Sequence, residues 1–173
     1  SANDGTHGQE PWISDGTPAG TQLVKDIRTG IAQSNPQDFA VFGTNFYFSA
    51  MDDTAGTELF RSNGTEGGTA LWKDINPGSG SSYPNGVTRC SNRGVFAAND
   101  GTAGSELWGT NSTNTLRLED INVGSDGSEP ESLVAAGPGC FFTAYTEETG
   151  RELYFVNITG GSTNLVKDVY AGA

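Results

Sequence analysis

The sequence predicts an all-β protein made of four tandem repeats of about 48 residues, and three observations support this fold class. A phrase of the type Glu-X-aromatic returns along the chain at steps of 48, 48 and 46 residues. The 173 residues include 25 glycines, which suit tight turns between short strands. Runs of Ala, Leu, Lys and Glu with helical spacing are scarce, so we expect no helix.

Three sets of equivalent positions define the repeat. The glutamates are Glu10, Glu58, Glu106 and Glu152, the aromatic residues are Trp12, Phe60, Trp108 and Tyr154, and the aspartates are Asp26, Asp74, Asp120 and Asp168. Because every copy carries the aspartate, we assign it to capping the turn that follows, by accepting backbone N–H bonds. We treat residues 1–173 as a single repeat domain and divide it into 1–48, 49–96, 97–142 and 143–173.

Each repeat is expected to hold four short strands. In and beside the second copy they are predicted at 39–43, 46–50, 58–62 and 70–75, separated by segments rich in Gly, Asp and Asn. Alternation along a strand puts Leu59 on one face and Phe60 on the other, where the aromatic ring can pack against a neighbouring repeat. Four antiparallel strands per repeat are the format of a β-propeller blade, so the fold predicted is propeller-like with four blades.

One of the four blades is incomplete in this division. Repeat 143–173 stops before the counterpart of 31–48, and a repeat cannot bury its faces alone. A longer natural chain, an unclosed blade, or a strand supplied by another molecule would each resolve the defect. We favour strand addition between copies, a head-to-tail contact that produces a ring or an open fibre.

The charge excludes some partners. The formal net charge is −12 and the pI is about 4.2, so a nucleic acid backbone would be repelled. No apolar run approaches the roughly 20 residues that span a bilayer. We expect neither a nucleic acid partner nor a membrane span, and we attribute the acidic surface to solubility before cation binding.

Cys90 and Cys140 are the two cysteines, and we place them in corresponding parts of neighbouring repeats. An even pair in a chain rich in turns suits an oxidising compartment, which favours a disulfide. Two free, buried thiols are the alternative.

Three asparagines are candidate glycosylation sites. The turn that reads Asp15-Gly16-Thr17 in the first copy becomes an N-x-[ST] acceptor at Asn63, Asn111 and Asn157. Their common register predicts N-glycans along one side of the protein. The alternative is that Asn simply replaces Asp in a turn.

Metal, cofactor and enzyme signals are weak. Oxygen-rich loops at 3–5, 52–53 and 99–101 lack the alternating acids of a strong Ca²⁺ loop. We therefore explain their Asp and Asn residues as turn formers and assign no metal site and no cofactor. Bound Ca²⁺ is kept as the alternative. His7 is the only histidine, and Glu147 and Glu148 are adjacent residues that do not form a glycosidase pair. We predict that the protein is not an enzyme.

Trp72 is the best candidate for a sugar-stacking surface. Trp12 and Trp108 occupy equivalent positions and are assigned to the core between repeats, whereas Trp72 stands where another copy has Val. A carbohydrate-binding module is therefore an alternative reading of the chain.

The segments EPWISDGTPAGTQLVKDI, ELFRSNGTEGGTALWKDINPG and ELWGTNSTNT resemble the ELWxxDGT repeat family. The resemblance covers nearly the whole chain and departs from the motif at Pro11, at 110–112 and at 156–158. It implies a secreted or surface-attached, repetitive and non-enzymatic protein. We therefore expect a structural extracellular glycoprotein that assembles with copies of itself, with a carbohydrate-binding or cation-dependent adhesion module as the alternative.

Overall fold

The computed structural model describes residues 1–171 and confirms the all-β fold class. Sixteen strands and no helix occur within these residues. The last two residues of repeat 143–173 lie outside the described range. The strands form five small antiparallel sheets, three of four strands and two of two strands.

The three full sheets have the same strand order, with each strand paired to the next along the chain. The first full sheet contains β5 (Gln37–Phe42), β6 (Asn45–Asp52), β7 (Gly56–Ser62) and β8 (Ala70–Lys73). The second contains β9 (Asn85–Cys90), β10 (Arg93–Asn99), β11 (Ser105–Thr110) and β12 (Thr115–Glu119). The third contains β13 (Glu131–Ala136), β14 (Gly139–Thr146), β15 (Gly150–Asn157) and β16 (Ser162–Lys167).

The N-terminal unit consists of the two small sheets. It contains β1 (Ala2–Asn3), β2 (Gln9–Glu10), β3 (Trp12–Ile13) and β4 (Gln22–Leu23), with β1 paired to β2 and β3 paired to β4. Pro11 has no N–H to donate and separates β2 from β3, while its carbonyl accepts a bond from Val24 N at 2.9 Å. Within residues 1–171 this unit has no counterpart of β5, β9 or β13.

The four predicted strands at 39–43, 46–50, 58–62 and 70–75 occur as β5 to β8. The full sheets begin at Gln37, Asn85 and Glu131, whereas the sequence division begins its repeats at 49, 97 and 143. Each observed full sheet thus begins 12 residues before the corresponding repeat of the sequence division. Periodicity gives the length of a repeat, but it does not say which strand begins a sheet.

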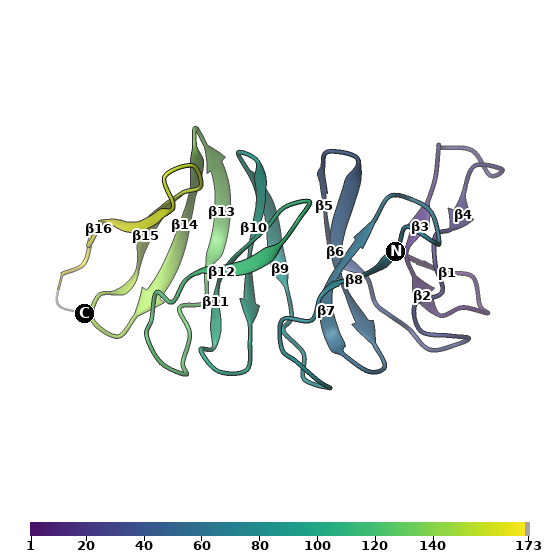
Figure 1. Cartoon of the computed structure of the whole chain (residues 1–173), viewed down its shortest axis with the longest axis horizontal. Helices are drawn as coiled ribbons and strands as arrows, with labels where there is room; N and C mark the ends of the chain where they lie inside the picture. The colour runs from purple at the N-terminus through teal and green to yellow at the C-terminus, as the bar shows by residue number, and fades with distance from the viewer. Residues whose placement is uncertain (172–173) are drawn as a thin grey trace.

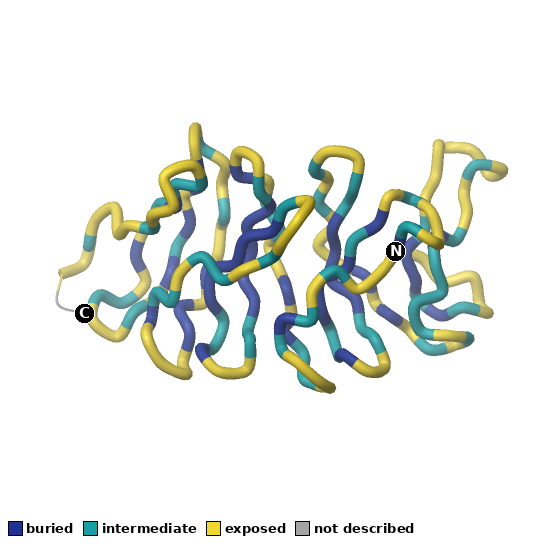
Figure 2. The backbone as a smooth tube through the Cα atoms, in the orientation of Figure 1, coloured by how far each residue is buried: buried dark blue, intermediate teal, exposed yellow. Residues whose placement is uncertain are grey.

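The sheets lie side by side in a row, with the N-terminal unit at one end and the third full sheet at the other (Figure 1). Within the described residues they do not close into a ring. Buried residues occupy the middle of the strands along the whole row, while the turns are exposed (Figure 2). The small hydrophobic content is thus divided among the spaces between consecutive sheets.

Three apolar clusters fill these spaces. Between the N-terminal unit and the first full sheet, Phe48, Ala50 and Phe60 are buried with Ile27 packed against them. The next space holds Tyr47, Leu59, Ile75, Phe96, Ala98 and Trp108, and the last holds Cys90, Val95, Leu107, Cys140, Phe142, Ala144, Tyr154 and Val156. The second and third clusters each draw side chains from two full sheets, and the first combines one full sheet with the segment that follows β4, so the sheets share their cores with neighbouring parts of the chain.

A disulfide joins Cys90 and Cys140, whose Cα atoms are 5.6 Å apart. The positions do not correspond, because Cys90 ends the first strand of its sheet and Cys140 lies in the second strand of the following sheet. In the preceding space Phe42 packs at the place of Cys90, against Gly94, where a β-carbon would collide with the Phe42 ring. The disulfide thus replaces an aromatic contact between consecutive sheets.

We expect the Cys90→Ser/Cys140→Ser variant to be less stable by about 4 kcal/mol, because the bridge closes a long loop in the unfolded chain. The two cysteines are 50 residues apart in the sequence. Urea denaturation of the oxidised protein and of the variant measures the difference, with Ser91→Ala as a neighbouring control. Equal midpoints, or two alkylated thiols in the untreated protein, would contradict the expectation.

Candidate functional site

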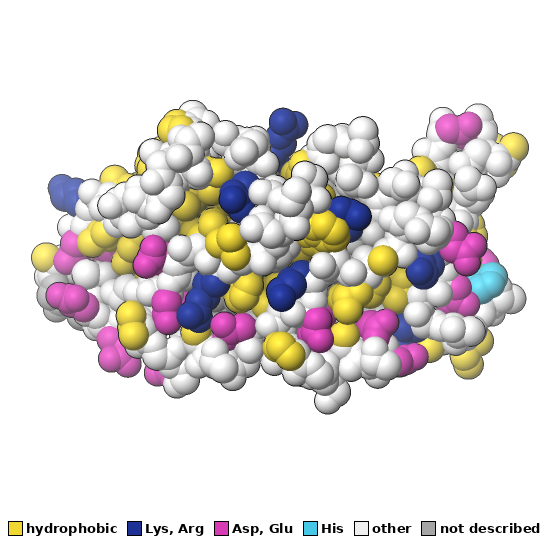
Figure 3. Space-filling view, in the orientation of Figure 1, with side chains coloured by type: hydrophobic (Ala, Val, Ile, Leu, Met, Phe, Trp, Pro, Cys, Tyr) yellow, Lys and Arg dark blue, Asp and Glu magenta, His cyan; other side chains and the backbone are white. Residues whose placement is uncertain are grey.

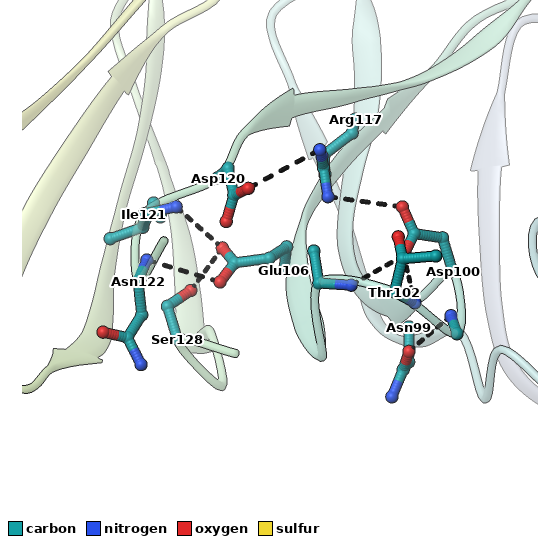
Figure 4. A network of polar contacts seen from close by, with 11 residues as sticks. Asn99, Asp100, Thr102, Glu106, Arg117, Asp120, Ile121, Asn122 and Ser128 are labelled. Atoms are coloured by element: carbon teal, nitrogen blue, oxygen red, sulfur yellow. Dashed lines mark hydrogen bonds and ion pairs between the residues drawn. The ribbon is translucent and has the colours of Figure 1, made fainter. Parts of the chain in front are cut away.

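A buried glutamate recurs in each unit and connects the strand on which it lies to the segment that leads to the next sheet. Figure 4 shows the copy at Glu106, which is fully buried on β11. Its carboxylate accepts hydrogen bonds from Ile121 N at 3.0 Å and Asn122 N at 3.4 Å. The Ser128 hydroxyl donates a third bond at 2.7 Å.

The copies at Glu10 and Glu58 repeat this arrangement. Glu58 accepts bonds from Ile75 N, Asn76 N and Ser82 N and from the Ser82 hydroxyl, the last at 2.6 Å. Glu10 accepts bonds from the backbone of 27 and 28 and from both N and Oγ of Ser34. Backbone and hydroxyl donors surround each carboxylate, which offsets the cost of burying it.

The serine of each network also contacts the following sheet. The carbonyl of Ser34 accepts a bond from Met51 N at 2.7 Å, and the same contact joins Asn99 N to Ser82 and Tyr145 N to Ser128. Each glutamate therefore holds a serine that is bonded to the second strand of the next sheet. This polar link runs beside the apolar cluster that fills the same space.

Glu152 is the terminal copy, and its network is smaller. It accepts bonds from Val169 N at 3.1 Å and Tyr170 N at 3.3 Å. Its residue is only 6% exposed, yet in the part of the chain that the structure describes no serine hydroxyl reaches it. The network thus ends where the row of sheets ends.

Burial raises the pKa of the Glu58 and Glu106 carboxyls above the ordinary value of 4.5, and the hydrogen bonds from serine and backbone only partly oppose it. The glutamates were recognised from the sequence only as a repeated set, and their hydrogen-bond network was not predicted. A signal was available, because a serine follows Glu10, Glu58 and Glu106 at 24, 24 and 22 residues.

The repeated aspartates lie next to these networks. Gly30 N donates to Asp26 at 3.1 Å and Gly78 N donates to Asp74 at 3.4 Å, as a capping role requires. Asp120 instead meets Arg117 at 3.6 Å, and Arg117 also reaches Asp100 at 3.3 Å (Figure 4). Across residues 1–171, the Oδ1 atoms of all four aspartates are buried without a hydrogen-bond partner.

The oxygen-rich loops bond to their own chain. Asp4, Asp52 and Asp100 each accept bonds from the backbone N and the hydroxyl of the threonine two residues later. Three or more His, Cys, Asp or Glu side chains do not gather at any one place among the described residues, so no metal ligand set is visible there. These loops are accounted for as Asx turns.

The residues considered for catalysis are separate. His7 Nδ1 lies 2.7 Å from Asp4 Oδ2, and this contact raises the His7 pKa. Glu147 and Glu148 are exposed in the turn between β14 and β15. The structure brings neither of them to His7, and the absence of enzymatic activity stays a prediction.

The three candidate glycosylation sites lie at equivalent places, where the third strand of each full sheet meets the turn before the fourth strand, and Asn157 is itself the last residue of β15. The amide oxygens of Asn63, Asn111 and Asn157 accept bonds from the backbone and hydroxyl of the threonine two residues later. The threonines themselves are exposed. Asp15 makes the same bonds to Thr17 in the N-terminal unit.

Trp72 is engaged by the protein on several sides. Its indole N–H donates to Thr110 Oγ1 at 3.0 Å, and the Arg61 guanidinium lies 3.8 Å from the ring centroid. The Tyr47 ring meets it edge-on at 6.2 Å. One ring face is therefore covered by Arg61, which leaves less room for a stacked sugar.

The free face of the third full sheet is the most distinctive surface. Leu153 on β15 is 39% exposed, whereas its counterparts Leu59 and Leu107 are 0% exposed. Phe141 on β14 is 38% exposed, whereas its counterparts Tyr47 and Val95 are 1% and 0% exposed. These side chains would be buried by another sheet of the same kind. Figure 3 shows other hydrophobic side chains at the surface, surrounded by acidic and basic groups.

We expect Glu106→Gln to destabilise the protein by about 1–3 kcal/mol, because the new amide donor would face backbone donors. Since burial raises the folded-state pKa of Glu106, the folded state binds more protons than the unfolded state between 4.5 and that raised pKa. The contribution of Glu106 to stability is therefore lost as the pH rises through this window. The stability difference between wild type and E106Q should grow as the pH falls.

Chemical denaturation across this pH range measures the difference, with the exposed Glu66→Gln as a control. A pH-independent difference equal to that of E66Q would refute the assignment.

Comparisons with known proteins show only a resemblance of fold. No protein-family model matches the chain, and no curated protein matches it. No helix among the described residues is long and apolar enough to cross a membrane. A solved structure from a mechanistic study of two prolyl endopeptidases and their inter-domain dynamics aligns with a TM-score of 0.50 at 16% identity. The alignment covers 74% of this chain and 19% of that chain, and at this identity it concerns the fold alone.

Proposed function

We propose that this chain is a structural, extracellular glycoprotein that assembles with copies of itself into an array of stacked sheets. The observation that carries the proposal is the free apolar face of the third full sheet, whose Leu153 and Phe141 are exposed where their counterparts are buried. Fully burying a side chain of this size contributes about 1.5–3 kcal/mol. Covering these two side chains would therefore favour association.

In this proposal the sheets are propeller-like blades of an ELWxxDGT-type repeat, three complete and one incomplete. The supporting features are the meander order within each full sheet and the position of β9 beside both β5 and β13. Strand exchange between neighbouring copies is the mode of assembly in this proposal, because main-chain hydrogen bonds at an open strand edge provide affinity.

The extracellular setting is supported by two features. The disulfide between Cys90 and Cys140 is consistent with an oxidising environment. The acceptor patterns at Asn63, Asn111 and Asn157 occupy turns at the same place in each full sheet, so glycans on them would line one edge of the array.

The alternative reading, a carbohydrate-binding or cation-dependent adhesion module, has less support. Arg61 covers one face of Trp72, and the Asp loops bond to their own threonines. Neither feature presents a free group to a sugar or a cation.

We expect the purified protein to associate reversibly as its concentration rises, and Leu153→Glu to weaken this association at least tenfold, because a charge would have to be buried in the contact. Sedimentation velocity over a concentration series measures both. Val123→Glu adds the same charge at an exposed position outside the face and is the control. A wild-type protein that stays monomeric throughout, or an L153E variant that associates as the control does, would overturn the proposal.

Expression through a eukaryotic secretory pathway should add N-glycans at the three acceptor turns. Intact mass spectrometry should show that Asn63→Gln, Asn111→Gln and Asn157→Gln each remove the mass of one glycan, and that Asp15→Gln removes none. A wild-type mass equal to that of the bare polypeptide would contradict the glycoprotein assignment.

A further inference from the structure

The internal space between the first and second full sheets provides a template for the contact between copies. Its apolar cluster has two halves. Tyr47, Leu59 and Ile75 come from the first full sheet and the segment after it, and Phe96, Ala98 and Trp108 come from the second full sheet. The Trp108 side chain thus packs toward the preceding sheet.

The C-terminal end of the molecule presents a counterpart of the first half. Phe141 corresponds to Tyr47, Leu153 to Leu59, and Val169 to Ile75. Ile75 is 3% exposed in its cluster, whereas Val169 is 73% exposed. All three positions hold apolar side chains, and all three are uncovered.

The N-terminal end presents part of the second half. Trp12 corresponds to Trp108 and Ala2 corresponds to Ala98. Phe60 and Tyr154 stand at the same repeat position as Trp12. Each packs in the apolar cluster that its sheet shares with the preceding part of the chain. Ile13, the next residue on β3, points the other way, since it approaches Gly64. Trp12 therefore faces the free end of the row, where it is half-buried.

We propose that the N-terminal unit of a second copy lies on the third full sheet in the register of this internal space, with Trp12 in the place that Trp108 takes. The inference rests on the proposed function and names the two surfaces that meet. Both halves of one cluster occur on opposite ends of the same chain, so a second copy is the occupant that fits them. The contact uses two different surfaces and is heterologous, which allows open-ended growth.

The register makes a second pair of residues adjacent. Between the first and second full sheets, the Trp72 indole donates a hydrogen bond to Thr110 at 3.0 Å. Between the N-terminal unit and the first full sheet, Val24 stands at the position of Trp72 and Ser62 at the position of Thr110, and both are buried. At the contact between copies the same pair is Val166 of one copy and Ser14 of the next. Both are exposed in the single chain.

Cysteines at these two positions test the register. We expect the Ser14→Cys/Val166→Cys variant, treated with a short thiol-reactive cross-linker, to give a ladder of covalent dimers, trimers and longer species on a denaturing gel. Ser14→Cys alone and Val166→Cys alone should not extend beyond a dimer, because each has one new thiol and the native cysteines are bridged. A Ser14→Cys/Val123→Cys variant is the matched control and should give no ladder.

A second variant tests the anchor without new thiols. Trp12→Ala should raise the dissociation constant measured by sedimentation at least tenfold, as is usual for a buried aromatic anchor. The unfolding midpoint should change little, because Trp12 lies at the end of the row.

The outcomes separate the two proposals. Association of the wild type without a ladder, or with unchanged affinity in Trp12→Ala, overturns this register and leaves self-assembly standing. A wild type that is monomeric at every concentration overturns both. A ladder from the double variant together with weakened association of Trp12→Ala supports the register.

Discussion

The fold depends on a buried carboxylate that organises the passage from one sheet to the next. Each sheet is thin and has little apolar surface of its own, so its position must be fixed by its neighbours. Glu58 and Glu106 collect backbone and serine donors from the segment that leaves their sheet, and the same serines are bonded to the following sheet. An ionised carboxylate accepts bonds at both oxygens and has no donor, whereas a glutamine amide accepts at one oxygen only and adds an NH2 donor group. The buried carboxylate thus fixes how one sheet is positioned relative to the next, while the hydrophobic clusters contribute most of the free energy of folding.

This arrangement places apolar side chains on both faces of a sheet. The apolar side chains that join one sheet to the next lie on both faces of a sheet, and at the two ends of the described row one set of them is exposed or half-buried. Leu153 and Phe141 show this at one end, and Trp12 shows it at the other. The acidic net charge opposes close approach of copies, and salt screens that repulsion. Apolar contact and charge repulsion therefore act against each other in any assembly.

Much of the fold could be predicted from the sequence because strand and turn signals are local. The alternation around Leu59 and the glycine-rich turns place β5 to β8 within a few residues of their observed bounds. The residue at which each sheet begins could not be predicted, because it depends on which strands pair across a turn and on the interruption at Pro11. The glutamate network was missed for a similar reason, since its donors lie 15 to 24 residues further along the chain and meet the carboxylate only in the folded unit.

The incomplete N-terminal unit sets a limit on the strength of the contact between copies. Trp12 and Ala2 are its apolar side chains at the positions of Trp108 and Ala98. A contact between copies in this register would therefore bury less apolar surface than an internal one, and it would have no equivalent of the Cys90 to Cys140 bridge. The contacts between sheets of one chain would therefore be more stable than the proposed contact between copies. Growth of the array would depend on concentration, while each subunit would stay folded.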